Sequence, residues 1–265
     1  GSYVRDDALR AARAYADAGF GVLIVAARDP WVGLRKIDPP DGVAVARRAN
    51  TAYDFGSWAH ALRTWPQIVQ KDLVVLTNDS IIGPLGPLDE MLRRLHASTA
   101  DVWGITESRT PADHLHSFFL AFRGGVLARH ELQSFFTNVR PLESKRDVVV
   151  TYEIGLTQAL ERVGLRREAG WTQSELGFPS STVLPLWAWK PLLDAGFPFV
   201  KRVLLTAPQF EDQRWRNAHA GQQRRIGGAE PCNTAREDHR RQRDDHRAKS
   251  LQREAPGQHQ QSRRQ

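Results

Sequence analysis

The sequence predicts an α/β domain of three layers, in which a mainly parallel sheet lies between two layers of helices. Short runs of consecutive apolar, often β-branched residues are typical of strands that are buried on both faces of a parallel sheet. Segments with the periodicity of amphipathic helices lie between these runs. Alternating strands and helices indicate units in which a helix crosses over from one parallel strand to the next.

The first half of the chain contains three of the expected strands. A helix over residues 5–18 has Leu9, Ala12 and Ala16 on one face, and Gly19 ends it. The elements expected next are strands over 21–27, 43–47 and 72–77 and a helix over 55–64 that ends before Pro66.

The second half continues the alternation more loosely. The elements expected here are a helix over 87–96, strands over 101–106 and 117–122, and helices near 125–137 and 153–163. Beyond them, Trp171, Trp187 and Trp189 stand among prolines, and we expect short helices and loops.

The composition changes abruptly near residue 212, which predicts a domain over 1–211 and a disordered tail over 212–265. Ile226 and Leu251 are the only large aliphatic residues of this tail. Such a segment buries too little apolar surface to offset the loss of backbone entropy on folding.

The net charge of +7 comes almost entirely from the tail, where 13 basic residues stand against 7 acidic ones. Because the body is close to neutral, we expect no nucleic-acid partner for it; a basic arm that binds nucleic acid remains the alternative for the tail. No run of about 18 apolar residues is present, which excludes a membrane-spanning helix in this sequence. The single cysteine, Cys232, favours a reducing compartment and hence the cytoplasm.

Asn78, Asp79 and Ser80 follow directly after a buried strand and form the sharpest local motif. Ligands of open α/β sheets bind at the carboxyl ends of strands, where a carboxylate can hold a divalent cation, Mg²⁺ or Mn²⁺, that bridges a diphosphate. The alternative is an Asx turn that merely ends the strand.

A polar loop follows the strand over 43–47 and contains Arg48, Asn50, Tyr53 and Asp54. These side chains suit recognition of a nucleotide base, a ribose or a diphosphate. Asn50 and Asp54 are equally good helix-capping residues, so capping stays open as the alternative.

Two further groups are candidates for the acceptor side and for catalysis. His114 and His116 flank Leu115 and share one face, in an acceptor groove or simply at the surface. Glu153 is expected in the first turn of a helix, where it is either a general base or a carboxylate stabilised by the helix dipole. The sequence has no Gly-x-Gly-x-x-Gly motif, phosphate loop or zinc-binding spacing.

Taken together, these motifs resemble the rhamnan synthesis protein F family of bacterial polysaccharide glycosyltransferases. The matching stretches occur in the family's order at 48–58, 76–85, 101–107, 114–122, 152–157 and 198–202. The resemblance covers about residues 3–205.

The resemblance implies transfer of a sugar, usually rhamnose from dTDP-L-rhamnose, to a cell-surface glycan on a fold of the GT-A kind. Asn78, Asp79 and Ser80 then correspond to the acidic metal motif, with Asp79 as the metal ligand, and Glu153 to the base. The residues expected on the acceptor side are Trp103, Glu107, His114 and His116.

The sequence departs from the family pattern at three points. The acidic motif has one aspartate instead of two, and His116 stands where an amide is expected. The family's domain also begins with a buried strand before the helix over 5–18. We expect that strand to be missing, which would leave a slot between the strands over 21–27 and 72–77 and weaken stability and activity.

We therefore expect an inverting glycosyltransferase that binds a nucleotide sugar and a glycan or lipid-linked glycan acceptor. Arg47, Arg48 or a cation at Asp79 would stabilise the leaving diphosphate. The acceptor suggests peripheral association with the inner face of the plasma membrane. The alternative from another class is a non-catalytic remnant or glycan-binding module of the same fold.

Overall fold

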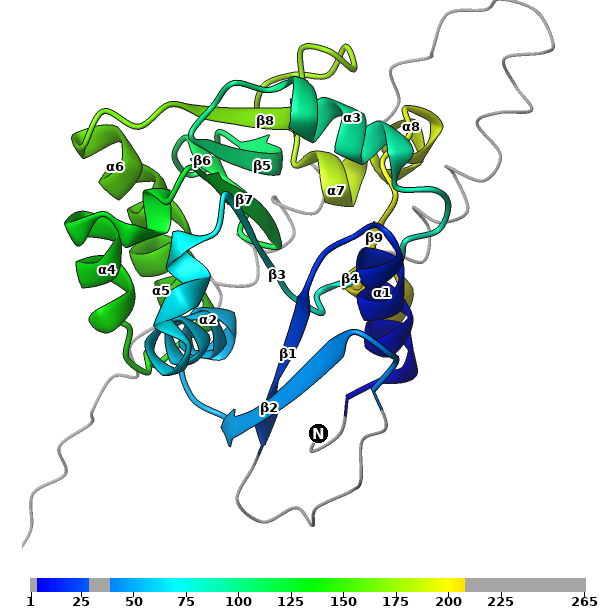
Figure 1. Ribbon diagram of the computed structural model, residues 1–265. Helices are drawn as coiled ribbons and strands as arrows, with labels where there is room; N and C mark the ends of the chain where they lie inside the picture. Colours follow the sequence, from blue (N-terminus) through cyan, green and yellow to red (C-terminus); the bar gives the residue numbers. More distant parts are fainter. Residues whose placement is uncertain (1–3, 29–38, 208–265) are drawn as a thin grey trace, which may run out of the picture. The chain divides into compact units, whose positions relative to one another are not determined.

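The computed structural model describes residues 4–28 and 39–207 (Figure 1). The chain divides into two units, 1–218 and 219–265, and the described residues all belong to the first. The predicted tail over 212–265, its disorder and the boundary at 211 lie outside the described residues, so these remain predictions.

The N-terminal part consists of α1 (Asp6–Asp17), β1 (Val22–Arg28) and β2 (Val43–Ala49), which confirms one expected helix and two expected strands. Asp6 and Asp7 occupy the first turn of α1, where the helix dipole favours carboxylates. β1 and β2 pair in parallel, from Val22 opposite Val43 to Arg28 opposite Ala49. They form a two-stranded sheet of their own.

A second sheet has five strands in the order β3-β7-β5-β6, with β8 also paired to β5. Its strands are β3 (Leu73–Thr77), β5 (Val102–Ser108), β6 (His114–Leu115), β7 (Phe119–Arg123) and β8 (Arg167–Trp171). β7 is antiparallel to both β3 and β5, and only β8 runs parallel to its neighbour.

The expectation of a mainly parallel sheet is therefore wrong for this sheet, which is mixed. The physical reason lies in the connection between β5 and β7, which contains no helix. Parallel neighbours need a crossover of a dozen or more residues, usually helical, whereas a short connection returns the chain antiparallel. The GT-A assignment stays a prediction.

Helices cover both faces of the mixed sheet (Figure 1). α2 (Tyr53–Thr64), α4 (His130–Thr137) and α6 (Gly155–Arg162) pack with Val74, Leu76, Leu120 and Phe122 into one core. α3 (Asp89–Ala97), α7 (Leu184–Trp187) and α8 (Trp189–Asp194) pack against the opposite face, with Trp103, Ile105 and Phe119. The alternating side chains of β3 and β7 thus serve two cores, as the period of two in a strand requires.

Short elements complete the described part. They are η1 (Pro66–Gln70), η2 (Val126–Ala128), α5 (Lys145–Val148), the π-helical segment η3 (Val149–Ile154) and α9 (Val203–Thr206). A two-stranded antiparallel ladder, β4 (Ile81–Ile82) with β9 (Val200–Lys201), joins the end of the described chain to the segment after β3. No described helix is long and apolar enough to span a bilayer.

Candidate functional site

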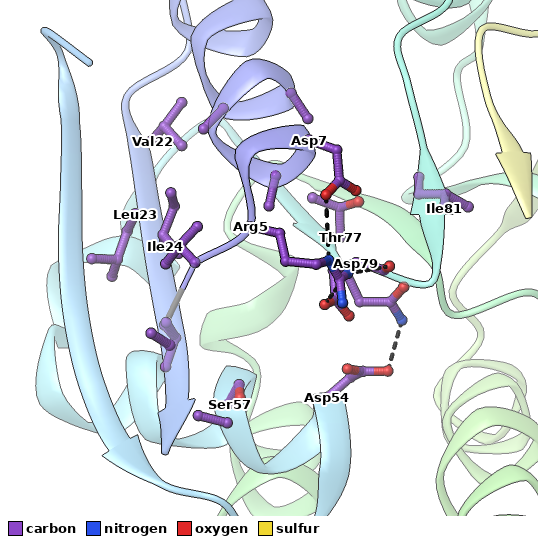
Figure 2. A pocket seen from close by; sticks show the side chains of 18 of the residues that line it. Arg5, Asp7, Val22, Leu23, Ile24, Asp54, Ser57, Thr77, Asp79 and Ile81 are labelled. Carbon is purple, nitrogen blue, oxygen red and sulfur yellow. Dashed lines mark hydrogen bonds and ion pairs between the residues drawn. The ribbon is translucent and has the colours of Figure 1, made fainter. Parts of the chain in front are cut away.

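A cavity of about 600 Å³ lies beside β1 and defines the candidate site (Figure 2). Its wall includes residues of α1 from Asp7 to Tyr15, residues 22–27 of β1, the start of α2 and the end of β3. Figure 2 shows Val22, Leu23 and Ile24 of β1 on one side and Asp7, Thr77 and Asp79 on the other. The volume falls within the range of about 300–1,000 Å³ that is typical of small-molecule sites.

Asn78 organises the polar end of this cavity. Its Oδ1 accepts hydrogen bonds from the Ser80 amide at 3.0 Å and from Ser80 Oγ at 2.7 Å. Its Nδ2 donates to Asp54 Oδ2 at 2.8 Å. The segment therefore is an Asx turn that ends β3, and it also connects β3 to the first turn of α2.

Asp54 is a carboxylate held in an unfavourable environment. Burial, together with the nearby charge of Asp79, raises its pKa to about 6, although Lys201, Lys145 and the bond from Asn78 act in the opposite direction. The two residues before it, Ala52 and Tyr53, have φ angles of 55° and 51° in the left-handed region. Such backbone strain is concentrated at functional sites. Asp54 is not the capping residue that the alternative foresaw, since Ala52 occupies the N-cap.

Asp79 is flanked by two guanidinium groups. Arg5 Nη2 lies 2.5 Å from Asp79 Oδ2 (Figure 2), and Arg202 Nε donates to the Asp79 carbonyl oxygen at 2.9 Å. Arg202 also forms an ion pair with Asp7. The site predicted from the sequence did not include Arg5, Asp7 or Arg202. Arg5 and Arg202 contact Asp79, and Arg202 contacts Asp7, only because the fold brings distant parts of the chain together.

This donor set does not fit the divalent cation predicted at Asp79. Arg5 already neutralises the Asp79 carboxylate. Within 4–28 and 39–207, no group of three or more His, Cys, Asp or Glu side chains is arranged to hold a metal ion. Hard divalent cations need several oxygen ligands, and here the Asp79 carboxylate is already paired with Arg5 while the Asp54 carboxylate accepts a hydrogen bond from Asn78.

Glu153 lies in a π-helical turn rather than at a helix start. α5, η3 and α6 follow one another from Lys145 to Arg162, so the expected dipole stabilisation of Glu153 in a first turn is wrong. Glu153 Oε1 instead accepts a hydrogen bond from the Ser117 amide at 2.8 Å, and its side chain is only 15% exposed. A π-helical turn widens the helix and is frequent at functional sites.

The two histidines lie beside Glu153. His114 Nε2 is 3.9 Å from Glu153 Oε1, and the two imidazole rings are 5.6 Å apart between centroids. Both side chains are buried, so the surface alternative is wrong. His116 Nδ1 lies 2.9 Å from Thr106 Oγ1, and burial, followed by the charge of Lys201, lowers the pKa of His116 well below its usual value.

Lys201 is a further basic residue of this site, and no role was predicted for it from the sequence. Its Nζ donates to Ser80 Oγ at 3.2 Å and sits 3.9 Å from the centroid of the Phe118 ring. The Phe118 ring in turn lies 5.5 Å from that of His116. Residues 198–202 place two basic residues directly after a short apolar run, and this pattern could have indicated that Lys201 belongs to the site.

The remaining predicted residues divide into two groups. Asn50 and Tyr53 line the cavity together with Asp54, Asn78 and Asp79. Arg48 instead serves the fold. It holds the loop before α2 through hydrogen bonds to Ser57 Oγ and Thr51 Oγ1 at 2.9 and 2.8 Å.

Two residues predicted on the acceptor side belong to β5. Trp103 is fully buried in the second core, edge-on to Phe119, and does not line the cavity. Glu107 pairs with Leu115 in the sheet, and its carbonyl oxygen accepts a hydrogen bond from Gln173.

Comparison with known families identifies the chain. The model of the family described as rhamnan synthesis protein F matches residues 42–221. The chain belongs to the rhamnan synthesis protein F family. Membership supports a role related to polysaccharide synthesis.

The chain is also similar to a more distant relative. It is 24% identical over 190 residues to virulence protein VirA of Vibrio anguillarum, including that of strain ATCC 68554 / 775. The alignment covers 60% of this chain and 60% of VirA, so the chain spans less than two thirds of that relative's length. No solved structure matches the chain significantly.

Proposed function

We propose that this member of the rhamnan synthesis protein F family transfers a sugar from a nucleotide-diphosphate donor to a cell-surface glycan. L-rhamnose from dTDP-L-rhamnose is the donor that we propose, with inversion at the anomeric carbon. The observation that carries the proposal is one cluster: Asp54, Asn78 and Asp79 edge the cavity, Lys201 donates to Ser80 in the same turn, and the charges of both Asp54 and Glu153 act on Lys201.

The donor would lie in the cavity beside β1. Its apolar wall suits the nucleoside, and its polar end, with Asn50, Tyr53, Asp54 and Asn78, suits the ribose and the phosphates. Arg5 and Arg202 are the guanidinium groups nearest to Asp79, so they take the place that the sequence suggested for Arg47 and Arg48. No step of the proposal passes through a divalent cation.

Glu153 would act as the general base. Its carboxylate takes the proton of the acceptor hydroxyl while that oxygen attacks the anomeric carbon. The bond between the anomeric carbon and the donor phosphate breaks, and its electron pair leaves with the nucleoside diphosphate. The hydrogen bond from the Ser117 amide fixes the carboxylate, and His114 stands beside it on the side proposed for the acceptor.

The acceptor that we propose is a glycan or a lipid-linked glycan. Such an acceptor would bring the protein to the inner face of the plasma membrane by peripheral association. His116 and Glu107 remain proposals for the acceptor side.

A binding and transfer experiment tests this function. Purified protein is incubated with a panel of nucleotide sugars, and the unfolding midpoint and the donor hydrolysis are measured. We expect dTDP-L-rhamnose to raise the midpoint more than the other donors, because a ligand that binds only the folded state stabilises it. Binding without hydrolysis or transfer would favour the glycan-binding alternative, and no shift with any nucleotide sugar would contradict the proposal.

A further inference from the structure

Lys201 is a partly buried cation that has no carboxylate partner in contact. Among the residues that the structure describes, its contacts are a neutral hydroxyl, Ser80 Oγ, and the face of the Phe118 ring. Two arginines near the same turn are paired instead: Arg5 with Asp79 and Arg202 with Asp7. Removing an ammonium from water costs free energy unless an anion compensates it.

The backbone fixes the position of this ammonium firmly. Lys201 pairs with Ile81 in the β4–β9 ladder, and the Arg202 amide donates to the Ser80 carbonyl oxygen at 2.8 Å. The side chain is therefore anchored to the turn that ends β3. A lysine on a short ladder, with its ammonium against the turn, cannot swing away into solvent without breaking these contacts.

The charges around Lys201 leave it available to a ligand. Asp54 on α2 and Glu153 on η3 act on it through charge, and Lys145 on α5 opposes them. Neither carboxylate forms an ion pair with Lys201 among the described residues. Ser80 Oγ accepts a hydrogen bond from Lys201 and donates one to Asn78 Oδ1, so the ammonium lies beside a neutral hydroxyl in the turn after β3, without a carboxylate in contact.

We propose that Lys201, held by Ser80, binds the phosphate of the nucleotide diphosphate that departs from the sugar. This inference rests on the proposed function. Ser80, which Lys201 contacts, directly follows Asn78 and Asp79, and these two residues line the cavity proposed for the donor. As the bond to the anomeric carbon breaks, negative charge develops on the phosphate oxygen, and an ammonium beside that end of the cavity would stabilise it. Lys201 would then supply the positive charge that was expected from a metal ion at Asp79.

Titration calorimetry on the full chain with dTDP, inorganic pyrophosphate and thymidine, all in EDTA, tests the proposal. We expect dTDP to bind in EDTA and Lys201→Met to weaken it about 10- to 100-fold, because a hydrogen bond to a charged group contributes about 1.5–3 kcal/mol. Lys201→Arg should restore most of the affinity. The matched control is Lys190→Met, since Lys190 pairs with Asp194 and should leave binding unchanged.

The wild-type chain provides a measurement that does not depend on whether the variant folds. Acetic anhydride labels lysines, and mass spectrometry reads each site with and without ligand. We expect dTDP to protect Lys201 but not Lys190, and thymidine to protect neither. Unchanged labelling of Lys201 at saturating dTDP would overturn the proposal, as would full dTDP affinity in Lys201→Met.

The outcomes also separate this proposal from the proposed function. Protection by pyrophosphate and dTDP without transfer of any sugar would support the phosphate site and count against the transferase. Protection by pyrophosphate without protection by dTDP would overturn the donor assignment. Transfer at the normal rate by Lys201→Met would leave the function standing and remove Lys201 from it.

Discussion

At the scale of single residues, the site alternates acidic and basic side chains around one turn. Arg5, Asp79, Arg202 and Asp7 form a continuous set of ion pairs and hydrogen bonds. Exposed ion pairs contribute little to stability, so we interpret this set as a means of positioning groups around the cavity. Asp54, Glu153 and Lys201 stand apart from it and are the residues that a reaction can use.

Glu153→Gln separates the catalytic interpretation from a structural one. The amide oxygen can still accept the hydrogen bond from the Ser117 amide, so the unfolding midpoint should change little. If Glu153 is the base, the transfer rate should fall about 10²- to 10⁴-fold while donor affinity is kept. The control is Glu131→Gln in α4, whose side chain is exposed. Near-normal turnover in Glu153→Gln would rule out the base.

Asp54→Asn should make the protein more stable at neutral pH. The pKa of Asp54 is raised from 3.8 to about 6 in the folded state, so its ionised form disfavours folding above pH 6. That penalty shrinks as the pH falls from 6 towards 4 and disappears only below the unfolded-state pKa of 3.8, where the carboxyl is protonated in both states. We expect the free energy of unfolding to rise by about 1–3 kcal/mol at about pH 7.5 and by clearly less at about pH 4.

Denaturant titrations at the two pH values measure this difference. Asp41→Asn, in an exposed turn before β2, is the control and should show no such pH dependence. If Asp54→Asn lowered the free energy of unfolding at neutral pH, the favourable interactions of the Asp54 carboxylate in the folded state would outweigh the cost of its burial.

At the scale of elements, β8 is the longest of the described strands that sequence patterns did not predict. The run from Arg167 to Trp171 has no β-branched residue, yet it pairs in parallel with β5. Its place depends on Gly170, because a Cβ there would come within 2.1 Å of the Trp103 ring. The glycine lets the backbone of β8 lie against a large core side chain.

Gly170→Ala should therefore destabilise the protein, by about 1–3 kcal/mol or more, because the buried Trp103 ring has no room to move. A lower denaturation midpoint, measured by tryptophan fluorescence, checks this. Gly86→Ala is the matched control, since a Cβ at that position meets nothing within 4 Å. Equal midpoints for the two variants would show that β8 can shift away from Trp103.

At the scale of the whole molecule, the basic excess and the catalytic candidates fall in different parts of the chain. Residues 212–265 carry most of the net charge, and every candidate residue precedes them. Their lack of aliphatic residues predicts that they add nothing to the core.

Deletion of residues 212–265 should leave the unfolding midpoint and the donor affinity unchanged. Circular dichroism melting and calorimetry on the shortened chain measure both quantities. A lower midpoint would mean that the tail packs on the domain. Salt-dependent nucleic-acid binding that disappears with the deletion would support the basic-arm alternative.

Most helices and strands could be predicted because their signals are local. The apolar runs that became β1, β2 and β3 and the amphipathic periodicity of α1 and α3 are carried by neighbouring residues. The position of Asn78 and Asp79 after a strand likewise predicted a ligand site, and the structure places both residues in the wall of the cavity. The order of six short motifs was enough to indicate the family.

Strand direction, the π-helical turn at Glu153 and the partners of Asp79 were decided only by tertiary structure. Arg5 and Arg202 are 74 and 123 residues away from Asp79 in the sequence. Periodicity reports which face of an element is buried, but it does not report which element covers it. Contacts between distant residues depend on how the sheets and helices pack, so the sequence alone determined the elements and the family, and the packing determined the charges that surround the site.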